Sequence, residues 1–276
     1  MSKMLLIFAC LAIGFFLLER LIPWRSQRLF RTGFLADIFY IPIHYLMRVV
    51  VNGFVATALV EYGAHVMAPS GSSPEEFGLL SGQPVWLQAI IVLVILDFIF
   101  YVTHRLKHKW NWWWRLHETH HSSKELDFLS SVRFHPLEKA LDRIIFLLPL
   151  TVLGPSEGAI LIWASVDVLV GMLIHSNTNI RIGPLIYLFV GPEMHRWHHS
   201  KDPSIQGHNF GNNFSVFDWI FGTAYVSHEK TAEFGIEEEN YPQGNIVRQF
   251  LFAFRPAKQA SGGGVMHYED SLEQEG

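Results

Sequence analysis

Long apolar segments are the feature that most restricts how this chain can fold. The clearest runs from Val85 to Val102, with Gln88 and Asp97 as its conspicuous polar interruptions. A helix of this length is about 27 Å long at 1.5 Å per residue, close to the ~30 Å thickness of the hydrocarbon layer. We therefore expect this segment to cross a membrane.

Two earlier apolar segments run from Met4 to Leu18 and from Leu35 to Val60. Lys3 precedes the first segment, as in a signal peptide, but no small-residue cleavage site follows it. We expect an uncleaved helix.

The composition agrees with membrane insertion. Half of the 276 residues are hydrophobic, and the mean hydropathy is +0.21. A net charge of −4, with no run of Lys and Arg interleaved with aromatic residues, argues against a nucleic-acid partner. Cys10 is the single cysteine, so an intramolecular disulfide and a thiolate-rich metal site are both excluded.

The positive charges of the connecting loops predict how the chain is oriented. The loop between the first two apolar segments holds four arginines, whereas Gly63 to Pro84 has no Lys or Arg. The first loop is then cytoplasmic and the second lies outside. Ile144 to Leu153 and Ala159 to Ile174 are apolar segments joined by a turn, and we expect them to form a membrane hairpin.

The predicted fold is all-α: polytopic membrane helices with a cytoplasmic helical cap. The absence of a recognisable targeting peptide or retrieval signal and the compact length favour a bacterial inner membrane, with an organellar membrane as the alternative. The expected organisation is N-terminal membrane helices and outer loop over 1–84, a histidine-rich domain over 85–230 with its membrane hairpin near 141–175, a cytoplasmic extension over 231–258 and a disordered tail over 259–276.

Eight histidines lie in three short clusters that carry the chemistry. Within each cluster the spacing is i, i+4 or i, i+3, i+4, which places the imidazoles on one side of a helix. The clusters are His104 and His108; His117, His120 and His121; and His195, His198 and His199. Neutral imidazole binds Zn, Fe, Cu or Ni, and a tetrahedral site uses four ligands. Eight ligands therefore indicate two metal ions.

Other residues are candidates for supporting roles. His175 ends the returning arm of the hairpin, at the depth of the clusters, and is a ninth expected ligand. His135 is a possible ligand that fits a structural role better. Asp97 lies seven residues before His104 on the same helical face, so we expect a histidine or metal partner for it. Further acidic candidates are Glu118, Glu138, Glu193 and Asp218.

Some conspicuous residues have simpler interpretations. Trp110, Trp112, Trp113 and Trp114 are typical of a membrane-surface belt, with a possible part in the substrate entrance. Asn209, Asn212 and Asn213 indicate turns. The isolated histidines are interpreted as structural or surface residues: His44, His65, His208, His228 and His267.

The clusters, with Arg133-Phe-His-Pro-Leu-Glu138 and Phe217-Asp-Trp-Ile-Phe-Gly-Thr223, resemble the fatty acid hydroxylase/sterol desaturase superfamily from Leu87 to Thr223. The resemblance implies a non-haem di-iron centre at the cytoplasmic face, with the eight clustered histidines and His175 as iron ligands. Some relatives have a further histidine where this chain has Gly171, which leaves a tenth ligand open between His135, water and none. No catalytic side chain beyond the metal centre is implied.

The resemblance also implies the reaction. O2 is used to hydroxylate or desaturate a lipid, and the same motifs serve sterol, carotenoid, fatty acyl, sphingolipid and alkylglycerol substrates. The remaining segments are too short for a fused cytochrome b5-like domain, so a separate ferredoxin- or cytochrome b5-like protein with its reductase is the expected electron donor. One alternative is a membrane zinc hydrolase, but nine histidines are more ligands than a zinc site needs. The other is a metal transporter, whose ligands would follow a path through the bilayer.

Overall fold

A computed structural model describes residues 2–51, 53–54, 78–202, 205, 207–227, 229, 233–238 and 240–256. Across these residues the regular structure is helical, apart from two isolated β-bridges, and the predicted all-α class is confirmed. The helices, in chain order, are α1 Ser2–Leu21, α2 Phe34–Val51, α5 Val85–Lys109, α6 Asn111–His121, η2 Phe128–Val132, α7 Pro136–Leu153, α8 Glu157–His175, η3 Gly183–Tyr187, α9 Pro192–His198, α10 Val216–Ile220 and α11 Ile246–Phe252.

Helix α8 is the centre of the packing, in contact with α1, α5, α9 and η2. Val92 and Leu96 of α5 are buried with Trp163 of α8 in one apolar cluster, which α7 completes. A second cluster joins Phe15 of α1 to Met172 of α8 through η2. Helix α8 therefore contributes to both apolar clusters and joins α5 and α7 to α1 and η2.

Three described helices are long and apolar enough to cross a membrane: α2, α5 and α8. Large apolar side chains remain exposed along the bundle, including Ile90 of α5, Leu148 of α7 and Ile162 of α8. An apolar surface of this extent fits lipid rather than water. The chain is a membrane protein. The predicted segment after Val51, most of the outer loop and the tail over 259–276 lie outside the described residues.

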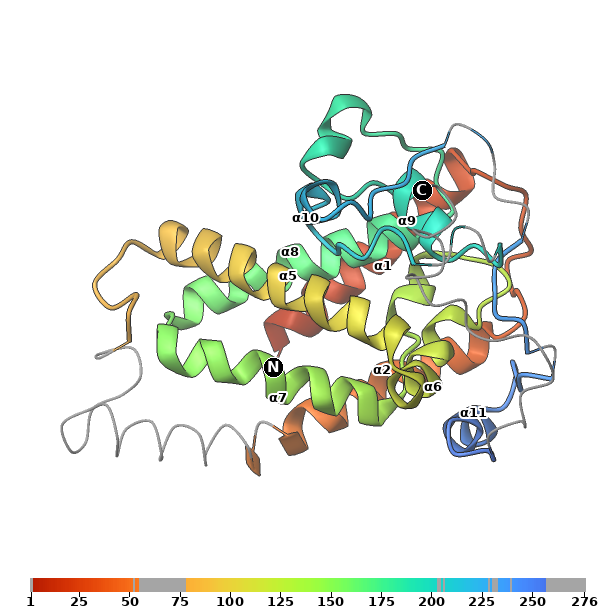
Figure 1. Cartoon of the computed structure of the whole chain (residues 1–276), viewed down its shortest axis with the longest axis horizontal. Coiled ribbons are helices and arrows are strands. Elements are labelled where there is room, and N and C mark those ends of the chain that lie inside the picture. Colours follow the sequence, from red (N-terminus) through yellow and green to blue (C-terminus); the bar gives the residue numbers. More distant parts are fainter. Residues whose placement is uncertain are drawn as a thin grey trace, which may run out of the picture.

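The short helices gather toward one end of the long ones (Figure 1). Helices α5 and α8 both end there, and α6, α9 and α11 lie beyond their ends. Because α7 runs back from this end to the turn before α8, the expected hairpin brings α8 back to the same end as α5. The histidine-bearing ends of α5 and α8 therefore meet the histidine-bearing helices α6 and α9.

Helix α7 begins earlier than the apolar run at Ile144 suggests. The His135 side chain accepts a hydrogen bond from the Leu137 backbone N–H, and Pro136 occupies the first turn, where its missing N–H is not needed. Hydropathy hides this first part because Glu138 and Asp142 are charged. Gly154 ends the helix at φ 57°, in the left-handed region that favours glycine.

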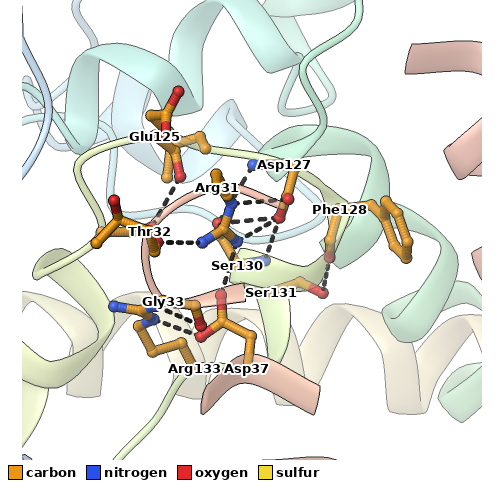
Figure 2. A network of polar contacts seen from close by, with 12 residues as sticks. Arg31, Thr32, Gly33, Asp37, Glu125, Asp127, Phe128, Ser130, Ser131 and Arg133 are labelled. Carbon is orange, nitrogen blue, oxygen red and sulfur yellow. Dashed lines mark hydrogen bonds and ion pairs between the residues drawn. The ribbon is translucent and has the colours of Figure 1, made fainter. Parts of the chain in front are cut away.

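A buried network of charges ties the segment before α2 to η2 (Figure 2). Arg31 binds the Asp37 carboxylate, with Nη2 and Oδ2 2.6 Å apart, and its Nε lies 2.7 Å from Oδ2 of Asp127. Arg133 binds the other oxygen of Asp37. All four side chains are almost fully buried. Each charge is paired, so the network fixes the backbone of Arg133 relative to α2.

Replacing Arg31 with methionine is expected to destabilise the protein by about 3–5 kcal/mol, because two buried carboxylates lose their main partner. Thermal unfolding of the purified protein in detergent measures this effect. Arg28→Met is the matched control, since Arg28 is exposed on the same loop and should change stability by less than ~0.5 kcal/mol. Equal melting temperatures for the two variants would contradict the assigned role of the network.

Candidate metal centre

The structure brings all nine predicted ligands into two adjoining groups, within each of which the potential ligand atoms lie within 4.8 Å of one another. The five-histidine cluster contains His104, His108, His117, His121 and His198, and the four-histidine cluster contains His120, His175, His195 and His199. Among the described residues, no potential ligand beyond these nine joins either group. The clusters touch: the His121 and His199 ring centroids are 4.5 Å apart.

Helical spacing divides each triple motif between the two clusters. On α6, His117 and His121 face the five-histidine cluster, and His120 faces the other. At α9 the division is reversed, because His195 and His199 join the four-histidine cluster and His198 crosses to the first. Each triple motif therefore supplies both clusters, which explains why three imidazoles occur within one helical turn.

Hydrogen bonds define which ring nitrogen faces the centre in the four-histidine cluster. Nδ1 of His120 lies 3.2 Å from the Arg133 carbonyl oxygen, and Nδ1 of His175 lies 2.7 Å from that of Gly171. A carbonyl oxygen only accepts, so both neutral rings carry their proton on Nδ1 and present a bare lone pair at Nε2. These two Nε2 atoms are 3.2 Å apart. Neither has a proton to donate, so the arrangement is repulsive unless a cation binds both.

The same pattern occurs in the five-histidine cluster. His104 donates from Nδ1 to the Phe210 carbonyl oxygen at 2.8 Å, and His117 donates from Nδ1 to Glu138 at 2.8 Å. Their Nε2 atoms face each other at 3.0 Å. Two nitrogens bound at right angles to one metal, each at about 2.1 Å, lie about 3.0 Å apart. The donor set therefore fits a transition-metal ion in each cluster.

Burial keeps these rings neutral. Desolvation, reinforced by neighbouring imidazoles, lowers the pKa of His120, His121, His195 and His199 well below its ordinary value. Desolvation also lowers the pKa of His198 to about 3. Neutral imidazole is the form that binds metal, so no proton has to leave these rings at pH 7.

A carboxylate supports His117 from α7. Glu138 Oε1 accepts from His117 Nδ1 and lies 2.9 Å from Nζ of Lys107, which also binds Asp142 at 2.7 Å. Burial alone would favour the neutral acid, but Lys107 and His117 hold the pKa of Glu138 below its ordinary value. Glu138 was one of the acidic candidates in the sequence, and its negative charge lies next to the His117 ring of the five-histidine cluster.

Asp97 has different partners from those expected. Its carboxylate accepts hydrogen bonds from the backbone N–H groups of Asn213 and Phe214 and from the Asn213 side chain, all at 2.8–2.9 Å. The expected histidine or metal partner is therefore not the one the structure gives it. The seven-residue spacing placed Asp97 on the correct face of α5, but the loop after Phe210 lies between it and the histidines.

The segment from His208 to Phe210 supplies two backbone carbonyls to the centre, which residue identity does not indicate directly. Besides Phe210, the His208 carbonyl accepts from Nδ1 of His198 at 2.8 Å. Asn209, between them, adopts φ 60°, and its side chain binds the Met194 and Tyr225 carbonyls. Asparagine tolerates this left-handed conformation, so the turn predicted here also aims both carbonyls at the centre.

Asp218 supports the same loop. Its carboxylate accepts from the backbone N–H groups of Phe210 and Gly211 at 2.7 and 2.9 Å and from the Thr223 hydroxyl at 2.7 Å. Asp218 thus holds the residue whose carbonyl binds His104. It lies outside both histidine clusters and acts on them through the backbone.

The remaining candidates have other contacts. His135 caps α7, and its Nε2 lies 3.2 Å from the Phe250 carbonyl, so it is outside both clusters. Glu118 pairs with Arg255 near the C-terminal end of the described chain, with one contact at 2.9 Å. Glu193 accepts from the Ile182 backbone N–H at 2.9 Å. His65, His228 and His267 lie outside the described residues.

The tryptophans divide into two groups. Trp110 and Trp112 are exposed, as a membrane-surface belt requires, whereas Trp113 is buried. Trp114 packs against the five-histidine cluster, with its ring 4.9 Å from His108 and 5.3 Å from His121. Phe134 covers the four-histidine cluster by stacking on His120 at 4.1 Å. Aromatic rings therefore shield both clusters.

Comparisons with known proteins agree with this geometry. Residues 89–223 match the fatty acid hydroxylase family. The chain is similar to the ornithine lipid hydroxylase OlsE of Rhizobium tropici, 32% identical over 169 residues, which are 61% of this chain and 49% of the relative. It is also similar to the human alkylglycerol monooxygenase, 30% identical over 49% of this chain and 30% of the relative.

A third relative is methylsterol monooxygenase 2-2 of Arabidopsis thaliana, 32% identical over 53% of this chain and 56% of the relative. The chain thus spans between 30% and 56% of the length of these three proteins. No solved structure matches the chain. The family match includes all nine clustered histidines, so the part of the chain that carries both clusters, residues 89–223, is similar to the fatty acid hydroxylase family.

Proposed function

We propose that this protein is a membrane-bound, iron-dependent enzyme that uses O2 to hydroxylate a C–H bond of a lipid. The observation that carries the proposal is the pair of adjoining clusters, in which five and four imidazoles turn toward one another within a buried centre. The three relatives support it, since their names denote a hydroxylase or monooxygenase and each name includes a lipid class. Desaturation, the other reaction expected from the motifs, has no support of this kind.

The nine clustered histidines are the proposed ligands of two iron ions, one in each cluster. Iron bound there supplies the redox chemistry that activates O2. Five nitrogens in one cluster exceed the four ligands of a structural zinc site, which favours iron over the zinc alternative. A transporter is disfavoured because the ligands are concentrated at one end of the membrane helices instead of following a path across them.

The surrounding residues orient the ligands. Four backbone carbonyls and Glu138 fix the proton of five rings on Nδ1, so that Nε2 is available to metal. Phe134 and Trp114 cover the rings and limit the access of water. In such a site, side reactions with water are suppressed.

The net reaction converts a lipid C–H, O2, two electrons and two protons into C–OH and water. We propose that the electrons come from a separate ferredoxin- or cytochrome b5-like protein with its reductase. The exposed start of α6, at Asn111 and Trp112, would then face the cytoplasm, in a bacterial inner membrane, as the loop charges predict. The four chain regions bounded at 84, 230 and 258 remain the proposed domain organisation, and the family match falls within 85–230.

Isotope labelling tests the function. Cells expressing the protein are grown under ¹⁸O2, and their lipids are compared by mass spectrometry with those of cells that express His120→Ala. We expect a lipid that carries one ¹⁸O in the first cells only. Unchanged lipids in the presence of a competent electron donor, or oxygen derived from water, would overturn the proposal.

A further inference from the structure

A cluster of charged and polar side chains lies between α2, α7 and α8, next to the metal centre and apart from its ligands. We call it the polar cluster, and its members are His44 and Arg48 of α2, Lys139 and Arg143 of α7 and Asp167 of α8. His44 and Arg48 are four residues apart, as are Lys139 and Arg143, so each pair lies on one face of its helix. Helices α2 and α7 pack together.

Lys139 connects the polar cluster to the four-histidine cluster. Its amine lies 3.7 Å from the centre of the Phe134 ring. That ring stacks on His120 at 4.1 Å, and it also lies 6.4 Å from the His117 ring and 6.5 Å from the His44 ring of α2. The ammonium group is thus next to a ring that contacts both α2 and the histidines, and 33% of the Lys139 side chain is accessible. A ligand can therefore reach it.

Arg143 extends the polar cluster away from the histidines. It lies four residues after Lys139, one turn further along the same face of α7. Asp167 lies eight residues before His175, about 12 Å along α8. The polar cluster therefore extends from the edge of the metal centre into the depth of the membrane helices.

The described members of the polar cluster are predominantly cationic, with three basic side chains and one acid. Asp167 also accepts a hydrogen bond from Asn212 at 2.9 Å. The two nearby acids of α7, Glu138 and Asp142, bind Lys107, although Asp142 also lies 3.9 Å from Lys139. Charged residues at membrane depth are costly and usually mark a binding site or pathway.

We propose that the polar cluster binds an anionic group of the lipid substrate, a carboxylate or a phosphate, with Lys139 and Arg143 as hydrogen-bond donors. This inference rests on the proposed function in taking the substrate to be a lipid. Lysine and arginine are the donors that proteins use for both anions, and arginine binds them in a bidentate manner. Because the Phe134 ring lies between Lys139 and His120, a lipid bound by Lys139 would have its anionic end next to the four-histidine cluster.

Equilibrium binding tests this inference without requiring turnover. The full-length protein in nanodiscs of neutral lipid is titrated with three probes: oleate, oleoyl lysophosphatidic acid and the uncharged monooleoylglycerol. We expect at least one anionic probe to bind about tenfold or more tightly than the neutral one, as one or two charge-assisted hydrogen bonds provide. Preference for oleate identifies a carboxylate site, and preference for the phosphate probe identifies a phosphate site.

Variants assign the preference to residues. Lys139→Gln and Arg143→Gln should each lower the affinity for the anionic probe about tenfold and leave the affinity for monooleoylglycerol unchanged. Lys139→Arg should retain most of the affinity for the anionic probe. Lys124→Gln, at an exposed lysine outside the polar cluster, is the control. Iron content and helical circular dichroism confirm that each variant is folded.

Equal affinity of all three probes, or an anionic preference that survives in both folded glutamine variants, would overturn the inference. If the anionic preference holds but no ¹⁸O enters any lipid, the proposed oxygenation fails while the binding site stands. If oxygenation occurs but the anionic preference is absent, the binding-site inference fails and the proposed oxygenation stands.

Discussion

His120→Ala and His198→Ala are each expected to abolish lipid hydroxylation, with a loss of at least ~100-fold, because changes to groups that merely support a ligand already cost 10–100-fold. His120 belongs to the four-histidine cluster and His198 to the five-histidine cluster, so each variant damages one metal site directly. Iron content by mass spectrometry and ¹⁸O incorporation measure the two effects.

His228→Ala is the control, because the sequence assigns this isolated histidine no part in the centre. It should retain both iron and activity. Wild-type iron content and turnover in His120→Ala and His198→Ala would show that the clustered histidines do not bind the catalytic metal.

Glu138→Ala is expected to weaken iron binding about 10–100-fold, the usual cost of removing a carboxylate that orients a histidine ligand. The change also leaves Lys107 with Asp142 as its remaining acidic partner among the described contacts, and therefore destabilises the fold. Competition with a chelator measures iron affinity, and thermal unfolding measures stability. Glu237→Gln, at an exposed glutamate, is the control.

A triple variant separates the two effects of Glu138. Lys107→Met combined with Glu138→Gln and Asp142→Asn removes all three charges of the buried group, so much of the lost stability should return. Iron affinity should remain low, because His117 has lost its anionic partner. Recovery of iron affinity along with stability would mean that Glu138 serves only to pair with Lys107.

The histidine motifs were predictable because ligand spacing is local. Residues at i, i+3 and i+4 are neighbours on any helix, so the sequence identifies the clustered imidazoles without knowledge of the fold. The division into five and four was not predictable, because it depends on the direction in which α6 and α9 approach each other. The structure shows the division, and with it the role of both triple motifs.

The polar support of the centre is only partly visible in the sequence. Glu138 stood among the candidates, but nothing local indicated Lys107, which reads as one of several basic residues at a helix end. The Phe210 and His208 carbonyls are backbone atoms and leave no mark in residue identity. Asn209 was a detectable signal, since asparagine favours the left-handed turn, but the pattern indicated only a turn.

Charged residues within apolar helices caused the main errors. The hairpin was expected near 141–175, whereas α7 begins at Pro136 and its acids Glu138 and Asp142 bind Lys107. Asp97 was assigned a histidine or metal partner for the same reason, since an isolated acid in a membrane helix demands compensation. The compensation comes from backbone N–H groups of a loop distant in sequence.

X-ray absorption spectroscopy of the iron-loaded, full-length protein tests the central claim most directly, when combined with metal analysis. The account predicts two irons per chain and a first shell dominated by imidazole nitrogen, with about four or five nitrogens at about 2.1 Å from each iron. A single bound metal, zinc in place of iron in a redox-inactive protein, or a shell composed mainly of oxygen would contradict it.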